Sequence, residues 1–208
     1  MNRRDAIGRV AILMGGAVIG AEFFLSGCKP SGAKSVDDLF TEDNTAFLNE
    51  VADTILPDTK ASPGAKAANV GGFMAIMVRD CYTPADQKIF VEGIGKLNDA
   101  ANKKSGSKFV DLTPQQRTDL LVDLDKEQKA FTADRDKKLS ADALAHKGEA
   151  NYKAPELPNH YFRMMKQLTL MGYFTSEVGA TKALRYIAIP GRYDGCVPYK
   201  KGDKAWAT

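Results

Sequence analysis

The stretch 112-LTPQQRTDLLVDLDKEQKAF-131 decides the fold class, because it carries both a start signal and the periodicity of an amphipathic helix. Thr113 is a typical N-cap residue, Pro114 takes the first helical position, and Gln116 completes a capping box. Apolar side chains at helical spacing then mark one face: Leu120, Leu121 and Leu124. The sequence therefore predicts a helix that begins near Thr113 and packs on a core through this face.

The stretch 83–104 repeats this arrangement, with Thr83 as the N-cap, Pro84 at the first helical position and Asp86 three residues after the cap. Helical patterns also occupy four other stretches: residues 41–57, 73–82, 158–176 and 176–187. The charged, alanine-rich segment 132–153 fits either a surface helix or a mobile insertion. Since no run alternates with period two, we expect an all-α, single-domain bundle of about six helices.

The C-terminal stretch 190-PGRYDGCVPYKKGDKAWAT-208 has a different composition, because glycine, proline and aromatic residues crowd into it. Such a segment is predicted to be irregular and to wrap the surface of the domain. Exposed Tyr and Trp side chains often anchor partners. Together with the preceding helix, the tail provides candidate partner contacts: Tyr173, Phe174, Arg192, Tyr193, Tyr199 and Trp206. The alternative is that the aromatic side chains only pack the tail onto its own domain.

The N-terminus resembles an export signal. Arg3 and Arg4 precede a nearly apolar run, residues 10–25, that is shorter than the roughly 20 residues of a membrane-spanning helix. A charged start followed by a short apolar region is typical of a secretory signal, and the arginine pair indicates the twin-arginine type. We therefore expect residues 1–27 to be a signal peptide read by the twin-arginine translocase.

The apolar run ends in 25-LSGC-28, which resembles a bacterial lipoprotein box. Lipidation of Cys28 would attach the mature protein to a bilayer, since stable anchoring requires more than one acyl chain. Residues 28–40 then form a tether and residues 41–208 the folded domain. The alternative is an incidental cysteine beside an ordinary cleavage site.

Two cysteines remain in the mature chain, Cys81 and Cys196. In an oxidising compartment such a pair predicts one disulfide, here closing a loop of more than a hundred residues. Two buried free thiols are the alternative. A metal site is not expected, because the sequence has two histidines and lacks a Cys-x-x-Cys pair.

The composition points to a globular protein and gives no sign of nucleic-acid binding. Of the 208 residues, 44% are hydrophobic and 26% charged, and the net charge is only +3. We find no dinucleotide fingerprint, phosphate loop, haem-attachment motif or iron–sulfur spacing. His146 lies in the charged segment and His160 at a helix start, so neither predicts catalysis. We expect no catalytic, cofactor or metal site in this chain.

Three stretches are similar to the gluconate 2-dehydrogenase subunit 3 family: residues 47–82, 111–125 and 161–206. The most specific parts are 52-ADTILPDT-59 with 62-SPGA-65, 168-LTLMGYFTSE-177 and 190-PGRYDGC-196. The resemblance covers nearly all of residues 40–208. The lipoprotein box at Cys28 departs from the family pattern, and it raises the prospect that this chain itself tethers a complex.

The resemblance implies a non-catalytic small subunit of a membrane-associated sugar or sugar-acid dehydrogenase. In such complexes a large flavoprotein of the glucose–methanol–choline type holds FAD, and a c-type cytochrome subunit contributes haem. The small subunit is expected to escort the flavoprotein to the periplasmic side of the bacterial envelope and to support its maturation. A free-standing envelope lipoprotein and an enzyme in its own right remain the alternatives.

Overall fold

The computed structural model describes residues 35–189, 191–192 and 195–207. Within these ranges the fold is all-α and contains no β-strand, only an isolated β-bridge near the C-terminus, which confirms the predicted class. Five α-helices occupy the described chain: α2 (Glu42–Ile55), α3 (Val70–Cys81), α4 (Pro84–Ser105), α5 (Pro114–Ala145) and α6 (Tyr161–Phe174). Four short 3-10 or π-helical segments lie before, between or after them: η1 (Asp37–Phe40), η2 (Ala65–Ala68), η3 (Phe109–Asp111) and η4 (Gly179–Ala183).

The helix starts follow the capping signals of the sequence. The Thr113 hydroxyl accepts from the Gln116 backbone N–H, and the Gln116 side chain accepts from the Thr113 N–H at 3.0 Å. The Thr83 hydroxyl caps α4 by accepting from the Asp86 backbone N–H, and it also contacts the Asp86 carboxylate at 3.3 Å, with Pro84 at the first helical position. Because each cap satisfies backbone groups that a helix start leaves unpaired, local sequence fixes where these two helices begin.

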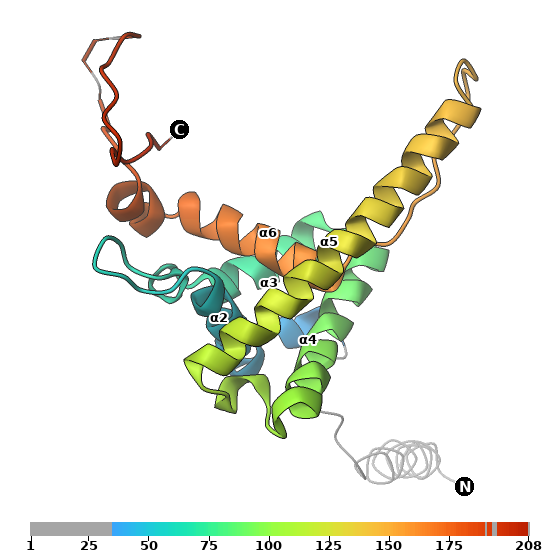
Figure 1. The fold of residues 1–208 in the computed structure, drawn as a ribbon, viewed down its shortest axis with the longest axis horizontal. Helices are drawn as coiled ribbons and strands as arrows, with labels where there is room; N and C mark the ends of the chain where they lie inside the picture. The colour runs from blue at the N-terminus through green and yellow to red at the C-terminus, as the bar shows by residue number, and fades with distance from the viewer. Residues whose placement is uncertain (1–34, 190, 193–194, 208) are drawn as a thin grey trace, which may run out of the picture. The chain divides into compact units, whose positions relative to one another are not determined.

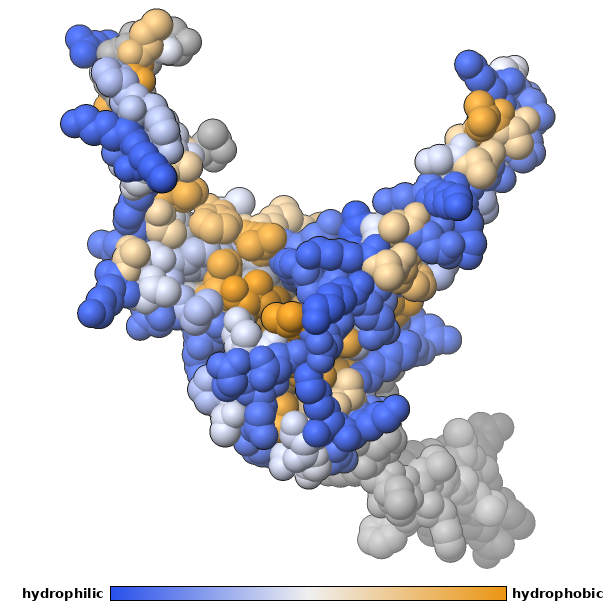
Figure 2. Space-filling view, viewed as in Figure 1, coloured by the Kyte–Doolittle hydropathy of each residue, from blue (hydrophilic) through white to orange (hydrophobic). Residues whose placement is uncertain are grey.

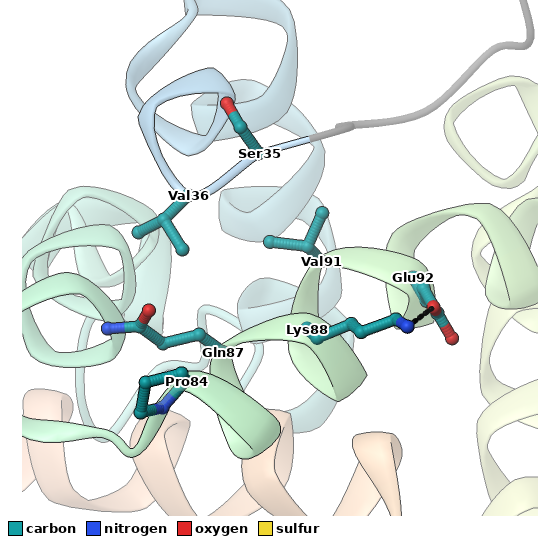
Figure 3. A pocket seen from close by; sticks show the side chains of 7 residues that line it. All are labelled: Ser35, Val36, Pro84, Gln87, Lys88, Val91 and Glu92. Atoms are coloured by element: carbon teal, nitrogen blue, oxygen red, sulfur yellow. Dashed lines mark ion pairs between the residues drawn. The ribbon is translucent and has the colours of Figure 1, made fainter.

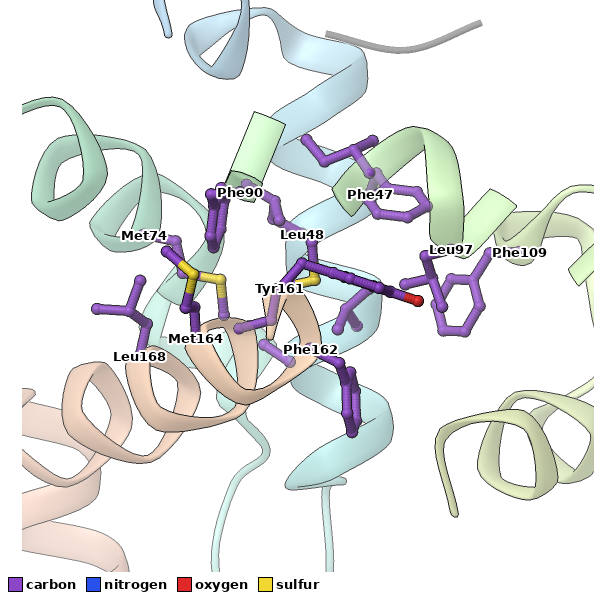
Figure 4. Packing of buried hydrophobic residues seen from close by; sticks show 14 of the residues in the cluster. Phe47, Leu48, Met74, Phe90, Leu97, Phe109, Tyr161, Phe162, Met164 and Leu168 are labelled. Carbon is purple, nitrogen blue, oxygen red and sulfur yellow. The ribbon is translucent and has the colours of Figure 1, made fainter. Parts of the chain in front are cut away.

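Helix α6 is the central element and packs against α2, α3, α4 and α5 (Figure 1). Figure 4 shows the core where aromatic and methionine side chains of α6 meet those of its neighbours. Two glycines allow the closest approaches. A Cβ at Gly93 of α4 would lie 2.6 Å from the Tyr161 Cβ, and one at Gly172 of α6 would lie 2.5 Å from the Phe73 Cδ1. These contacts fix how α4 and α3 seat against α6.

Ion pairs at the edge of the core join helices that are distant in sequence. Asp125 of α5 binds Lys166 of α6 at 2.5 Å and Lys129 at 2.8 Å. The hydrogen bonds from Lys129 and then Lys166 hold the pKa of the Asp125 carboxyl well below its usual range. Glu50 of α2 lies between Lys66 and Arg117; burial raises its pKa, but the two cations outweigh burial and lower it.

Helix α5 is longer than its sequence signal suggested. It runs for 32 residues, and its buried side chains all lie in the part up to Gln128. The charged segment 132–153 is therefore mostly a continuation of this helix, which ends at Ala145. Figure 1 shows this last part of α5 projecting past the other helices. Residues 146–160, which lead back to α6 and which we call the returning segment, lie beside it. Arg135 donates to Asn159, which donates to Asp86 at 3.0 Å, so the returning segment is fastened to the start of α4.

The helix expected over residues 176–187 is shorter than predicted. Residues 177–183 are helical, the last five of them as the π-helix η4, and the Leu184 N–H donates to the Gly179 carbonyl at 2.9 Å. Leu184 then takes an extended conformation, which ends the helical path. The Ser176 hydroxyl accepts from the Gly179 N–H at 3.0 Å and so caps the start of this short helix.

A candidate partner-binding surface

Helix α6 exposes an apolar stripe on the side opposite the core. Leu170, Met171 and Phe174 recur at helical spacing and are all exposed, whereas Thr169, Gly172 and Tyr173 between them are buried. Figure 2 shows hydrophobic residues gathered over α6 and bordered by hydrophilic residues of α5. Contiguous exposed apolar surface on a small protein typically marks an interaction site. We define Leu170, Met171 and Phe174 as the α6 stripe.

The C-terminal segment is closed at its base by contacts between Arg185 and Trp206. The Arg185 N–H donates to the Ala205 carbonyl at 2.8 Å, and the Ala207 N–H donates to the Arg185 carbonyl at 2.9 Å. The Arg185 guanidinium lies 3.9 Å from the centroid of the Trp206 ring. Lys204 also donates to the Lys182 carbonyl. We call residues 186–205, which lie between these contacts, the clasped loop.

The tail therefore does not wrap the domain as predicted, because Ala205 and Ala207 near its end bond to Arg185 at its start. Within the clasped loop several large apolar side chains are exposed: Tyr186, Ile187, Ile189, Val197 and Tyr199. Ile189 and Tyr199 are 84% and 79% exposed, so neither packs on the helices of its own domain. The alternative, in which the tail aromatics serve only to pack the tail on the domain, does not describe Tyr199.

The predicted contact residues separate into three groups. Phe174, Arg192, Tyr199 and Trp206 are exposed, as a contact residue must be. Tyr173 is instead a core residue with 2% exposure, and its hydroxyl donates to the Pro63 carbonyl. It is corrected here from a surface contact to a packing residue, because its position on α6 faces inward. Tyr193 lies outside the described residues.

The predicted disulfide between Cys81 and Cys196 is absent from the structure, since Cys81 is a free and exposed thiol. The contact between Gly172 and Phe73 sets the end of α6 beside the start of α3, whereas Cys81 is the last residue of α3. The backbone bonds of Arg185 to Ala205 and Ala207 then hold the end of the tail beside its start. The alternative, two buried free thiols, does not describe the structure either, because Cys81 and Cys196 are both exposed.

Three hollows lie on the described surface. The hollow in Figure 3, about 440 Å³, is lined by the start of α4 and by Ser35 and Val36, and its charged side chains, Lys88 and Glu92, pair at 4.0 Å. A second hollow of about 410 Å³ lies along the returning segment. In it the Thr83 hydroxyl donates to the Asp86 carboxylate at 3.3 Å, a contact that belongs to the cap of α4. A third, about 370 Å³, is bordered by Lys60, Lys182 and Lys204.

Both histidines have structural partners. The His160 Nδ1 accepts from the Phe162 N–H at 3.2 Å, so this ring caps α6, and its Nε2 lies 3.4 Å from Glu127. His146 ends α5 and stacks on Tyr152, with ring centroids 4.0 Å apart. Burial, with a further contribution from Glu127, raises the pKa of Tyr161 to about 12, so its hydroxyl stays neutral in the core. These positions explain the ring side chains without invoking catalysis.

In the described part of the chain, no group of three or more His, Cys, Asp or Glu side chains could hold a metal ion. None of the helices in the same ranges is both long and apolar enough to cross a bilayer. The predicted export signal at Arg3 and Arg4 and the predicted lipidation site at Cys28 lie outside the described residues.

Sequence reasoning missed part of this surface. It selected Phe174 but not Leu170 or Met171, although all three lie on the same helical face. The signal that could have found them is the excess of apolar residues in α6, since a helix of this composition has more hydrophobic side chains than one buried face can hold. The clasp at Arg185 had no local signal, because it joins residues far apart in the chain.

The fold and surface define a class: a small all-α protein with apolar side chains exposed on α6 and on the C-terminal segment. The family model described as gluconate 2-dehydrogenase subunit 3 matches residues 42–191, and the chain belongs to that family. It is accordingly an accessory subunit of a dehydrogenase complex. Neither a curated protein nor a solved structure matches the chain.

Proposed function

We propose that this chain is the non-catalytic small subunit of an FAD-dependent sugar or sugar-acid dehydrogenase, and that it escorts the flavoprotein subunit during export and maturation. The observation that carries the proposal is the family match, which spans residues 42–191 and therefore covers nearly the whole helical domain. In this assignment FAD belongs to a partner of the glucose–methanol–choline type. Haem belongs to a c-type cytochrome subunit.

The leader supports the escort role. Twin-arginine signals direct the export of folded proteins, and Arg3 and Arg4 provide such a signal at the start of this chain. No nucleotide-binding fingerprint accompanies it in the sequence. A partner that binds its cofactor before export is already folded, and it can travel bound to this chain only by a route that exports folded proteins. The partner then needs no signal of its own.

The lipoprotein box supports an additional tethering role. Acylation of Cys28 would hold the chain on the periplasmic side of the envelope, because several buried acyl chains together give stable attachment. Residues 29–35, KPSGAKS, are of a composition suited to a flexible linker. The complex would then be anchored through its small subunit.

The escort role is tested by replacing Arg3 and Arg4 together with lysine and following both subunits in cell fractions. We expect the wild-type chain to bring the co-expressed flavoprotein to the periplasmic fraction, and the double variant to leave both proteins in the cytoplasm. The matched control replaces Lys137 and Lys138 with arginine, which changes two exposed cations outside both the leader and the C-terminal segment. Export of the flavoprotein with the Arg3 and Arg4 variant would contradict the escort role.

A separate measurement tests the tether. Substitution of Cys28 with serine removes the acceptor thiol but leaves Arg3 and Arg4 in place. We expect the variant and its flavoprotein to move from the membrane fraction to the soluble periplasmic fraction. If the chain travels without any flavoprotein, the free-standing lipoprotein is the better description.

A further inference from the structure

The clasped loop is held at its base, and its described residues are exposed. Two backbone hydrogen bonds, at 2.8 and 2.9 Å, and the stacking of Arg185 on Trp206 bring its ends together. Loop closure is thereby completed before any partner binds, so binding does not have to supply that part of the ordering free energy. The Ser176 hydroxyl donates to the Tyr173 carbonyl of α6 at 2.6 Å and accepts from the Gly179 N–H at 3.0 Å, so these bonds fix the direction of the chain after α6.

We propose that the described residues of the clasped loop, 186–189, 191–192 and 195–205, form the docking element for the flavoprotein subunit, and that Tyr199 and Ile189 are its anchors. The proposal rests on the function proposed above, and it specifies the chemistry of the partner: apolar pockets surrounded by carboxylates on a folded protein. Arg185 and Trp206 are positioning residues, which present the loop without themselves forming the main contact.

The apolar part of the recognition comes from side chains that the domain leaves uncovered. Ile189 and Tyr199 bury little of their surface in this chain. Tyr presents a large rigid surface with few rotatable bonds and a hydroxyl, which suits the centre of an interface. The α6 stripe lies immediately before η4 in the chain and extends the apolar surface from the loop onto α6 (Figure 2).

The charge of the C-terminal segment predicts which charge surrounds the apolar pockets on the partner. Residues 185–206 contain five cations and two carboxylates: Arg185, Arg192, Lys200, Lys201 and Lys204, with Asp194 and Asp203. Lys200 and Lys201 are exposed side by side. A partner with carboxylates around its pockets would be attracted by this excess, which raises association rates and makes them depend on salt.

A protein partner fits this loop better than a lipid surface. The described residues within the loop form turns but no helix, and in one of the turns the Asp203 N–H donates to the Lys200 carbonyl at 3.0 Å. Backbone groups without internal partners are costly to place in hydrocarbon, whereas a protein surface can pair with them. The loop also lacks the amphipathic helix with which proteins commonly lie in a bilayer interface.

The anchors are tested with full-length chain purified in detergent and titrated with the FAD-loaded dehydrogenase subunit of the same organism. Tyr199→Ala is expected to weaken binding at least about 10-fold, as truncation of an interface anchor commonly does. Ile189→Ala is expected to weaken it several-fold. The matched control is Leu144→Ala on α5, where the side chain is 72% exposed but lies outside the loop. The control should bind within about 2-fold of wild type.

The charge requirement is tested with a second matched pair. Lys200 and Lys201 changed together to glutamate should slow association and weaken binding by about 10-fold at low salt, with a smaller difference at high salt. Lys137 and Lys138 form another adjacent exposed pair, on α5, and their change to glutamate should have little effect. Equal losses from the two double variants would overturn the role of the loop, because they would report only net charge.

Three outcomes separate this proposal from the proposed function. If wild type binds the dehydrogenase and Tyr199→Ala binds equally well, the docking element is wrong and the proposed function stands. If wild type does not bind the dehydrogenase, both are wrong. If Tyr199→Ala instead reduces binding only to vesicles of phosphatidylcholine and phosphatidylglycerol, the loop serves the membrane and the docking proposal is overturned. Circular dichroism melts should match wild type for every variant, because the changed side chains are exposed.

Discussion

Arg185 lies 3.9 Å from the centroid of the Trp206 ring, and its backbone bonds to both neighbours of Trp206. This relationship converts the last part of the chain from a loose end into a closed loop. The stacking contributes about 0.5–1 kcal/mol at an exposed site and adds to the two backbone hydrogen bonds that close the loop.

The first prediction concerns this clasp. Trp206→Ala removes the ring and should speed amide hydrogen exchange at Arg185 and Ala207, whose N–H groups close the loop. The expected increase is several-fold, in keeping with the loss of about 1 kcal/mol. Trp206→Phe retains an aromatic ring and should stay close to wild type. Unchanged exchange in the alanine variant would show that the ring does not hold the clasp.

The second prediction compares two glycines in helices. At Gly172 a new Cβ would meet Phe73 at 2.5 Å, so Gly172→Ala should lower the free energy of unfolding by about 1–3 kcal/mol. At Gly95 of α4 no atom lies within 4 Å of the new Cβ. Gly95→Ala should therefore raise the free energy of unfolding by about 0.5–1 kcal/mol. Urea unfolding measures both, and a shift of the same sign would contradict the packing of α3 on α6.

The third prediction concerns acid stability. The pKa of Asp125 in the folded protein is lower than in the unfolded chain because of Lys129 and Lys166. Its contribution is therefore complete above about pH 4, the unfolded value, and is lost as the pH falls further. Asp125→Asn should lower the free energy of unfolding by up to about 1 kcal/mol at pH 7, and the difference from wild type should narrow towards pH 2.

A control for this effect lies on the same helix. Asp134 pairs with Lys138 at 2.7 Å, but both side chains are mostly exposed. Asp134→Asn should change the free energy of unfolding by only a few tenths of a kcal/mol. If the two variants behave alike across the pH range, the pair between Asp125 and Lys166 does not stabilise the contact of α5 with α6.

The fourth prediction separates stability from binding at two adjacent residues. Tyr173→Phe removes the hydroxyl that donates to the Pro63 carbonyl, and should cost about 1 kcal/mol of stability with no effect on binding of the dehydrogenase. Phe174→Ala should do the reverse, because its ring is exposed on the α6 stripe. Thermal melts and the binding titration distinguish the two. A binding loss confined to Tyr173→Phe would argue against the inward position of that ring.

The fifth prediction concerns Cys81. Because its thiol is free and exposed, Cys81→Ser should leave the melting temperature unchanged, and a maleimide should label the native wild-type protein at this position. A disulfide to Cys196 would close a long loop, and its loss would cost several kcal/mol. A large fall in melting temperature under non-reducing conditions would therefore restore the disulfide that the structure lacks.

Local sequence determined the helix starts and the fold class. Thr83 and Thr113 cap their helices in the structure as their sequence signals require, because a cap depends only on residues three positions apart. The family assignment also followed from sequence, and the match over residues 42–191 confirms it. The apolar face of α5 was found for the same reason, since helical spacing alone places Leu120, Leu121 and Leu124 together.

Only the tertiary structure decided which of these features face solvent and where the tail lies. The sequence treats Tyr173 and Phe174 alike, yet the packing of α6 among four helices buries one ring and exposes the other. The sequence also does not show that Arg185 contacts Trp206, because that contact depends on the position and direction of the chain after α6. The position of Cys81 relative to the end of α6 likewise follows from the direction of α3 relative to α6, a property of packing that no local pattern encodes.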